Sequence, residues 1–113
     1  MRRETIEKPW GRFERFTLNE QSTVKLIFVK KGEALSLQTH EHRSEFWKIV
    51  KGSPTVEIGE TIVEAFPGDE FMVREKEPHR ISANDEDVEI LEISIGDFNE
   101  EDIIRIEDKY GRA

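Results

Sequence analysis

The chain has 113 residues, no cysteine and a formal net charge of −8. This length suits one domain, and we expect residues 1–113 to form it. Without cysteine there is neither a disulfide nor a thiolate metal site, and the acidic balance argues against nucleic acid as a partner, because phosphate backbones require a basic face. The charged first residues do not resemble a signal peptide, and no apolar run approaches the ~20 residues of a membrane span. We therefore expect a soluble, cytoplasmic protein without a membrane partner.

Apolar residues alternate with polar ones in short segments, which is the period of β-strands. Turn residues separate these segments, and no long helical pattern lies between them. This arrangement predicts an all-β barrel or sandwich. The expected strands fall within residues 23–30, 34–42, 45–50, 54–59, 61–66, 70–74 and 88–96.

Two segments carry further expectations. Residues 23–30, TVKLIFVK, are apolar on both faces at their centre, which indicates that one face meets a partner and predicts a homodimer. Residues 98–111 look different, because Asn99 can cap a short helix that has acidic residues in its first turn. We expect one or two helical turns there, packed on the outside of the barrel.

The stretch QTHEHRSEFW, residues 38–47, contains two of the three histidines of the chain. Residues two apart on a strand point to the same side, and their Cα atoms lie roughly 6.6 Å apart, so two such side chains can bind one ion. Gln38 and His42, roughly 13 Å apart, are too distant to share an ion. Either Gln38 and His40 or His40 and His42 form the pair; the competing interpretation is a solvated polar strand.

Two more residues can complete a metal site. Glu45 follows a possible turn and can face the ion from the next strand, and His79 follows Pro78, which restricts the backbone just before it. Nitrogen and carboxylate ligands with one amide oxygen suit a single borderline divalent ion. We expect zinc first, with manganese, iron or nickel as alternatives.

The segment GEALSLQTHEHRSEFWKIVKG resembles the first motif of the cupin superfamily. Gly32, Gln38, His40, Glu45 and Gly52 fall on the motif positions without a gap. Glutamine in place of the usual first histidine, with the residues around it, is similar to the cupin domain of type II phosphomannose isomerases, and the likeness extends along nearly the whole chain. It implies a double-stranded β-helix, or jelly-roll barrel. It also implies four metal ligands: Gln38, His40, Glu45 and His79.

The resemblance also implies a function, a metal-dependent aldose–ketose isomerase that interconverts mannose 6-phosphate and fructose 6-phosphate. His42 is then the candidate for proton transfer, because it faces the same way as the ligands. Arg43 is a second catalytic candidate and the best candidate for binding the phosphate. The other cations that we expect to bind the phosphorylated sugar are Lys48, Arg80 and Arg105.

Two alternatives belong to other classes. A cupin that binds a sugar or sugar phosphate without catalysis is favoured by two departures from the family pattern: Phe46 replaces a common histidine, and the second cupin motif is loose, with Arg74 and Lys76 at its usual proline and glycine. A metal-dependent oxygenase is the other alternative, since a Gln, His, Glu and His ligand set can bind iron.

Overall fold

The fold was obtained as a computed structural model, which describes residues 1–112. These residues form strands separated by short turns, and the all-β prediction is confirmed. The strands are β1 (Glu4–Lys8), β2 (Gly11–Arg15), β3 (Ser22–Val29), β4 (Leu37–Thr39), β5 (Arg43–Lys51), β6 (Thr55–Ile58), β7 (Thr61–Glu64), β8 (Glu70–Val73), β9 (His79–Ser82), β10 (Val88–Gly96) and β11 (Ile104–Glu107).

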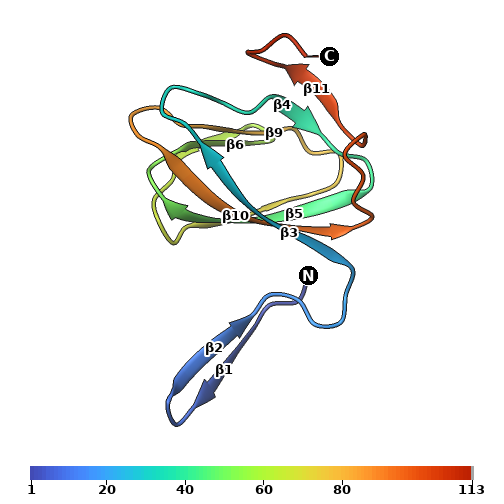
Figure 1. Cartoon of the computed structure of the whole chain (residues 1–113). Coiled ribbons are helices and arrows are strands. Elements are labelled where there is room, and N and C mark those ends of the chain that lie inside the picture. The colour runs from blue at the N-terminus through green and yellow to red at the C-terminus, as the bar shows by residue number, and fades with distance from the viewer. Residues whose placement is uncertain (113) are drawn as a thin grey trace.

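Two sheets face each other and enclose the interior of the barrel (Figure 1). One has the strand order β3-β10-β5-β8, and the other has the order β11-β4-β9-β6-β7. Strands β1 and β2 form a separate two-stranded hairpin that extends away from the barrel (Figure 1). The assignment of residues 1–113 to one domain stays a prediction, and Ala113 lies outside the described residues.

The barrel interior is apolar at one end and polar at the other. Along β5 the side chains that point inward run from Arg43 and Glu45 through Trp47 to Ile49, all of them buried. Strand β10 runs antiparallel beside it and places Ser94 opposite Glu45. The apolar end packs as one cluster and stabilises the fold through burial, whereas the polar end gathers ionisable groups. The buried members of the cluster are Val29, Trp47, Ile49, Val56, Ala65, Val73, Ile81, Ala83, Val88 and Ile90.

The prediction of a short helix within residues 98–111 is wrong. Asn99 does accept a hydrogen bond from the backbone of Glu101, but only a turn follows it, and the chain then enters strand β11. Ile104 and Ile106 alternate with Arg105 and Glu107, and this period of two fits pairing with β4, where Arg105 lies opposite Gln38. Pairing with an open sheet edge outweighs the local capping signal.

Gly52 is held in a conformation that other residues rarely adopt. Its φ is +85°, and an added Cβ would lie 2.5 Å from the carbonyl oxygen of Asp87. We expect Gly52→Ala to lower the free energy of unfolding by about 2–4 kcal/mol, because backbone strain and a steric clash add. Gly68→Ala is the matched control, with φ +93° but open surroundings, and should cost only about 1–2 kcal/mol. Urea unfolding of both variants measures the difference, and equal losses would contradict the steric argument.

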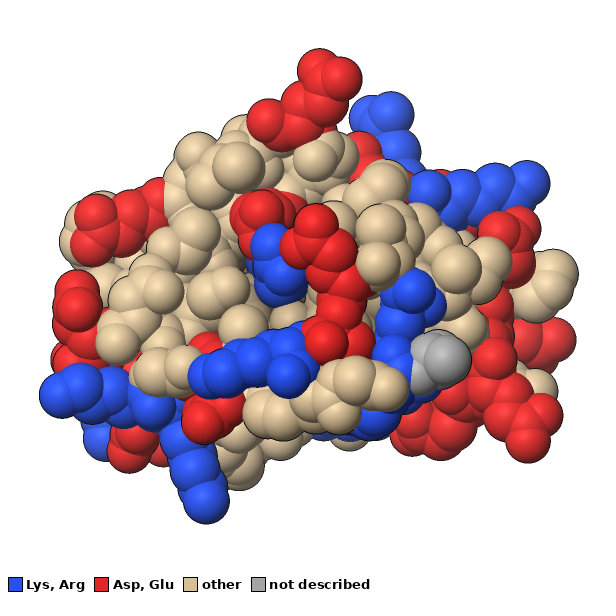
Figure 2. Space-filling model, turned by 90° about the horizontal axis from the view of Figure 1, so that it is seen from above, with Lys and Arg blue, Asp and Glu red and all other residues tan. Residues whose placement is uncertain are grey.

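The surface carries both signs of charge. On the face shown in Figure 2, basic and acidic groups are interspersed around the rim, and a basic group lies between acidic ones in a central hollow. Within residues 1–112 the structure has no helix that is long and apolar enough to span a membrane.

Candidate metal centre

Three elements bring the predicted ligands together at the polar end of the barrel. His40 directly follows β4, Glu45 lies on β5 and His79 begins β9. Gln38 of β4 pairs with His79 in the sheet. His40, Glu45 and His79 each expose only 2% of their surface. The structure therefore joins the residues in a buried group, although they come from distant parts of the sequence.

The donor atoms of this group have the spacing of a metal site. One ligand atom from each of His40, Glu45 and His79 lies within 4.8 Å of the others. Nε2 of His40 is 3.3 Å from one Glu45 oxygen, and Nε2 of His79 is 3.6 Å from the other. Donors bound to one ion at about 2.1 Å lie roughly 3–4 Å apart, so these separations fit a divalent cation.

Backbone carbonyls fix the orientation of both imidazole rings. His40 donates from Nδ1 to the carbonyl of Asp102 at 2.6 Å, and His79 donates from Nδ1 to the carbonyl of Glu77 at 2.8 Å. Each ring then carries its proton on Nδ1 and turns the lone pair of Nε2 toward Glu45. This arrangement is typical of histidine ligands, whose other nitrogen donates to a carbonyl or carboxylate.

His79 provides the strongest sign that a cation is needed. Its Nε2 is buried and has no hydrogen-bond partner among the described residues. Burial lowers the pKa of His79, against the opposing effect of the Glu45 carboxylate, so the ring is neutral and Nε2 is a pure acceptor. A buried acceptor that faces a carboxylate oxygen is unfavourable unless a cation or a proton lies between them.

Gln38 borders the group and can supply a further ligand. Its Nε2 is 3.5 Å from Nε2 of His40, and its Oε1 accepts a hydrogen bond from the hydroxyl of Ser36 at 2.7 Å. Rotating the amide by 180° turns Oε1 toward the group, and the Ser36 hydroxyl can then accept from the amide instead. Of the two alternatives from the sequence, Gln38 with His40 is the pair that lies at the group.

Arg43 is the cation that already contacts the group. It is buried, its Nε donates to Glu45 at 3.2 Å, and its Nη2 is 3.3 Å from Nε2 of His40. Nη1 donates to the carbonyl of Asn99 at 3.1 Å, and the guanidinium lies 4.4 Å from the ring centre of Phe98. An ion bound at His40 needs the lone pair that Arg43 approaches, so metal binding and this Arg43 contact compete.

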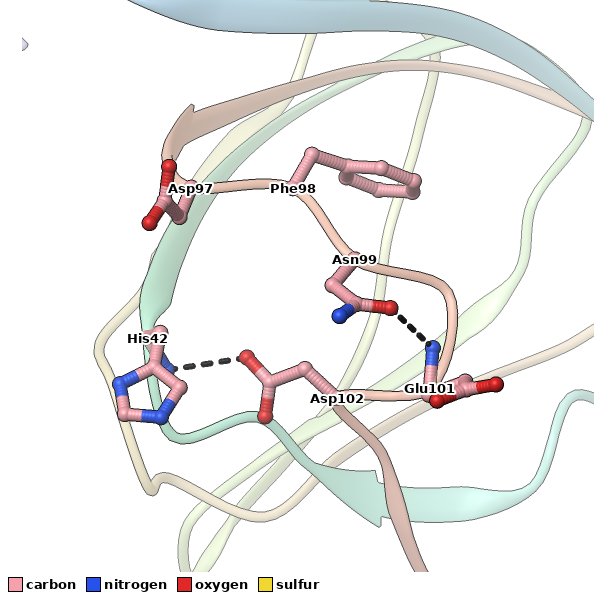
Figure 3. Close-up of a pocket in the computed structure, with 6 residues that line it drawn as sticks. All are labelled: His42, Asp97, Phe98, Asn99, Glu101 and Asp102. Atoms are coloured by element: carbon pink, nitrogen blue, oxygen red, sulfur yellow. Dashed lines mark hydrogen bonds between the residues drawn. The ribbon is translucent and has the colours of Figure 1, made fainter.

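The segment that follows β10 closes this end of the barrel. The Asp102 carboxylate accepts hydrogen bonds from the backbone N–H groups of Glu41 and His42, and the first of these bonds contributes most to lowering the pKa of Asp102. Phe98 and Asn99 face His42 across a pocket of about 410 Å³ (Figure 3). The full lining is His42, Asp97, Phe98, Asn99, Glu101 and Asp102. His42 is exposed and belongs to this pocket rather than to the buried group.

The other three predicted cations lie on β5, β9 and β11. Lys48 points to the outer side of β5, where it pairs with Glu70 at 3.4 Å. Arg80 lies next to His79 but on the opposite face of β9, and it pairs with Glu57 at 2.6 Å. Arg105 lies opposite Gln38 in the sheet and is half-buried. Of the four cations predicted to bind the sugar phosphate, Arg43 has the contacts with His40 and Glu45 described above.

The sequence interpretation missed a second buried carboxylate near the metal group. Glu92 on β10 is only 7% exposed and accepts a hydrogen bond from Ser94 at 3.3 Å. Burial, followed by the charge of Glu45, raises its pKa to about 7, while Lys25 and Arg43 act in the opposite direction. Alternation along β10 was the available signal, because Glu92 shares a strand face with core residues Val88 and Ile90.

The raised pKa of Glu92 predicts a pH-dependent stability for the metal-free protein. The folded state holds the Glu92 proton more tightly than the unfolded state, so this residue makes stability fall as pH rises from about 4.5 to about 7. Glu92→Gln removes this loss. We expect the variant to gain up to about 3 kcal/mol over the wild type above pH 7 and little at pH 4. Urea unfolding at pH 4, 6 and 8 tests this, and a difference that is constant with pH would contradict it.

The two facing sheets and the histidines and carboxylate turned into one end define the class of this protein, a cupin. The barrel superposes on oxalate decarboxylase from Bacillus subtilis with a TM-score of 0.70 at 25% identity, covering 77% of this chain and 24% of that chain. A cupin 2 conserved barrel domain protein from Rhodopseudomonas palustris gives a TM-score of 0.65 at 22% identity, covering 74% of this chain and 62% of that chain. These neighbours confirm the predicted double-stranded β-helix.

The chain belongs to the family described as "Mannose-6-phosphate isomerase C-terminal", whose model matches residues 1–108. It is 34% identical over 110 residues to the xanthan biosynthesis protein XanB of Xanthomonas campestris, covering 96% of this chain and 24% of XanB. It is 33% identical over 110 residues to the mannose-1-phosphate guanylyltransferase ManC of Salmonella typhimurium, covering 96% of this chain and 23% of ManC. The chain thus spans about a quarter of the length of these curated relatives.

The predicted mannose-6-phosphate isomerase function is wrong. The relatives are named for guanylyl transfer to mannose 1-phosphate or for polysaccharide biosynthesis, which is not the interconversion of an aldose and a ketose. The family description names a domain and does not assign its reaction to every member. Proton transfer by His42 belonged to the isomerase reaction and is not carried further. Mannose 1-phosphate and xanthan biosynthesis stand in the names of the relatives themselves, and the oxygenase alternative stays an untested prediction.

Proposed function

We propose that this chain is a metal-dependent binding module for a phosphorylated sugar, with Gln38, His40, Glu45 and His79 as ligands of one divalent ion. The observation that carries the proposal is the buried Nε2 of His79, which faces Glu45 without a donor among the described residues. Two imidazoles, a carboxylate and an amide suit zinc, with manganese, iron and nickel as alternatives. When bound, the ion supplies a Lewis acid that can take a sugar oxygen.

The pocket beside the group offers matching chemistry for the rest of the ligand. Arg43 lies between the group and the pocket, because it contacts His40 on one side and the backbone of Asn99 on the other. Its guanidinium is the cation suited to a phosphate, since it can donate two parallel hydrogen bonds. The acidic side of the pocket, with Asp97 and Glu101, disfavours phosphate but can accept hydrogen bonds from sugar hydroxyls.

The relatives indicate which phosphorylated sugar to test. ManC is named for mannose 1-phosphate, and XanB matches this chain over a similar length. Mannose 1-phosphate is therefore the first ligand to test. Mannose and inorganic phosphate are its two fragments, and each of them probes one side of the pocket.

Calorimetry of the same preparation with and without zinc tests the proposal. We expect uptake of one zinc ion per chain, followed by binding of mannose 1-phosphate at least about tenfold more tightly to the zinc form than to the metal-free form. Both fragments should bind more weakly than the intact ligand. Failure to take up zinc, manganese, iron or nickel would reject the metal centre. Equal affinity of the two forms for mannose 1-phosphate would reject the role of the metal in binding the sugar.

A further inference from the structure

Trp47 lies where the polar end of the barrel meets the apolar cluster. It follows Glu45 by two residues on β5, so both side chains point inward. Trp47 is 1% exposed and packs in the apolar cluster, whereas Glu45 belongs to the buried group with His40 and His79. The indole and the His79 ring meet edge to face, with ring centres 5.5 Å apart and an angle of 66° between their planes. Trp47 is therefore a core residue that borders the metal centre.

The indole of Trp47 also donates a hydrogen bond to Glu45. Its Nε1 is 3.1 Å from Oε1 of Glu45, the oxygen that faces Nε2 of His79. A buried indole N–H needs an acceptor, but a backbone carbonyl would satisfy it as well as a carboxylate. Here the acceptor is the carboxylate of the buried group. Because a carboxylate accepts at two oxygens, this bond leaves Oε2 open to another partner.

Arg43 is a second donor to the same carboxylate, and it holds the other oxygen. Its Nε donates to Oε2 of Glu45 at 3.2 Å. With one donor on each oxygen, the carboxylate cannot rotate freely. Oε2 faces His40 at 3.3 Å, and Oε1 faces His79 at 3.6 Å. The carboxylate is thus already oriented toward both imidazoles, and an ion does not have to order it.

The two donors respond differently to a cation in the buried group. The guanidinium of Arg43 is positive and approaches the lone pair of His40, so it competes with the ion. The indole is neutral and its N–H points at the carboxylate, so an ion held by the imidazole lone pairs leaves this bond in place. Trp47 is therefore the donor that still orients Glu45 once an ion has displaced Arg43.

We propose that Trp47 is a positioning residue of the metal centre, whose indole N–H holds the Glu45 carboxylate in the orientation that binds the ion. This role rests on the proposed function, because it requires an ion in the buried group. Loss of a residue that orients a metal ligand typically lowers metal affinity about 10- to 100-fold. Trp47 and Arg43 then act in opposite directions on one carboxylate, since one supplies an orienting bond and the other a repelling charge.

Replacement of a single N–H group tests the role. Trp10, the other tryptophan of the chain, is 73% exposed in the turn between β1 and β2, so Trp10→Phe leaves Trp47 as the sole tryptophan. A tryptophan auxotroph grown on β-(3-benzothienyl)alanine inserts this analogue at position 47, with sulfur in place of the N–H and the fused rings kept. The same variant grown on tryptophan is the matched control. Zinc affinity, measured against a competing chelator, should be about 10- to 100-fold lower in the benzothienyl protein.

Cobalt spectra and urea unfolding separate positioning from packing. A carboxylate that has lost its orienting bond should change the visible absorption of bound cobalt(II), which reports ligand geometry, whereas loss of core packing alone should not. Urea unfolding of both metal-free proteins shows whether the barrel is intact. Trp47→Phe also lacks the donor, and its zinc affinity should fall at least as far.

Three results would overturn the role of Trp47. Equal zinc affinities and equal cobalt spectra in the benzothienyl protein and its control would show that the indole only packs in the core. A gain of zinc affinity would show that the N–H opposes the ion, as Arg43 does. Failure of the control itself to take up zinc or cobalt would reject the metal centre together with the role, so the two failures are distinguishable.

Discussion

Replacing His79 by glutamine should lower zinc affinity at least about 100-fold, while the same replacement at His42 should leave it nearly unchanged. Loss of a ligand costs at least as much as the 10–100-fold that follows loss of a residue orienting one. His79 turns its buried Nε2 toward Glu45, whereas His42 is exposed on the wall of the neighbouring pocket. Titration of both variants with zinc against a competing chelator measures the two affinities.

The two variants, His79→Gln and His42→Gln, also distinguish the two ligand sets that the sequence left open. Zinc held by His40 with His42 would be lost in His42→Gln, and zinc held by Gln38 and His40 with His79 would survive that change. Retention of zinc by His79→Gln would contradict the buried group as the metal centre. Circular dichroism of both variants shows whether the barrel is intact, so that unfolding is not mistaken for loss of a ligand.

Replacing Arg43 by glutamine should move metal affinity and ligand affinity in opposite directions. The guanidinium contacts His40 Nε2 and Glu45, so its removal frees a lone pair and takes a positive charge away from the ion. Zinc affinity should rise by about tenfold or more, since like charges this close repel even at an effective dielectric constant near 20. Mannose 1-phosphate affinity of the zinc form should fall about 10- to 100-fold, the range for hydrogen bonds to charged groups.

Arg80→Gln is the matched control for this variant. Arg80 adjoins His79 in sequence, but it pairs with Glu57 on the other face of β9. Neither affinity should change by more than about twofold, since Arg80 lies on the face of β9 opposite to His79 and its ion pair with Glu57 does not involve the donor atoms of the group. A loss of zinc affinity in Arg43→Gln would show that the guanidinium supports the metal site, and it would contradict the competition between them.

The period of two along the strands explains which parts of the site were predictable. Inward and outward residues alternate, so the pattern alone puts Glu45 and Trp47 on one face and Phe46 on the other. The same rule puts Lys48 and Arg80 outside the barrel, and the list of phosphate-binding cations included them because it followed charge rather than strand face. Glu92 was missed for a related reason, since residues 88–96 were predicted as a strand without following the face that Glu92 shares with Val88 and Ile90.

Other features depend on contacts between distant segments, which the sequence pattern does not contain. The acceptors that orient His40 and His79 are backbone carbonyls, and any residue type can supply one. The contact between Arg43 and His40 arises because β5 turns Arg43 inward beside His40. Ile104 and Ile106 were assigned to a helix because the cap at Asn99 is a local signal, whereas the sheet edge at β4 that recruits them is not.

The contacts of Asp102 have a consequence for how the site is assembled during protein synthesis. Its carbonyl orients the ring of His40, which precedes it by 62 residues. At a translation rate of about 5–20 residues per second, the ribosome needs roughly 3–12 s to make this stretch. During that interval His40 has no fixed acceptor, so we expect the nascent chain to hold zinc weakly and capture of the ion to follow closure of the barrel.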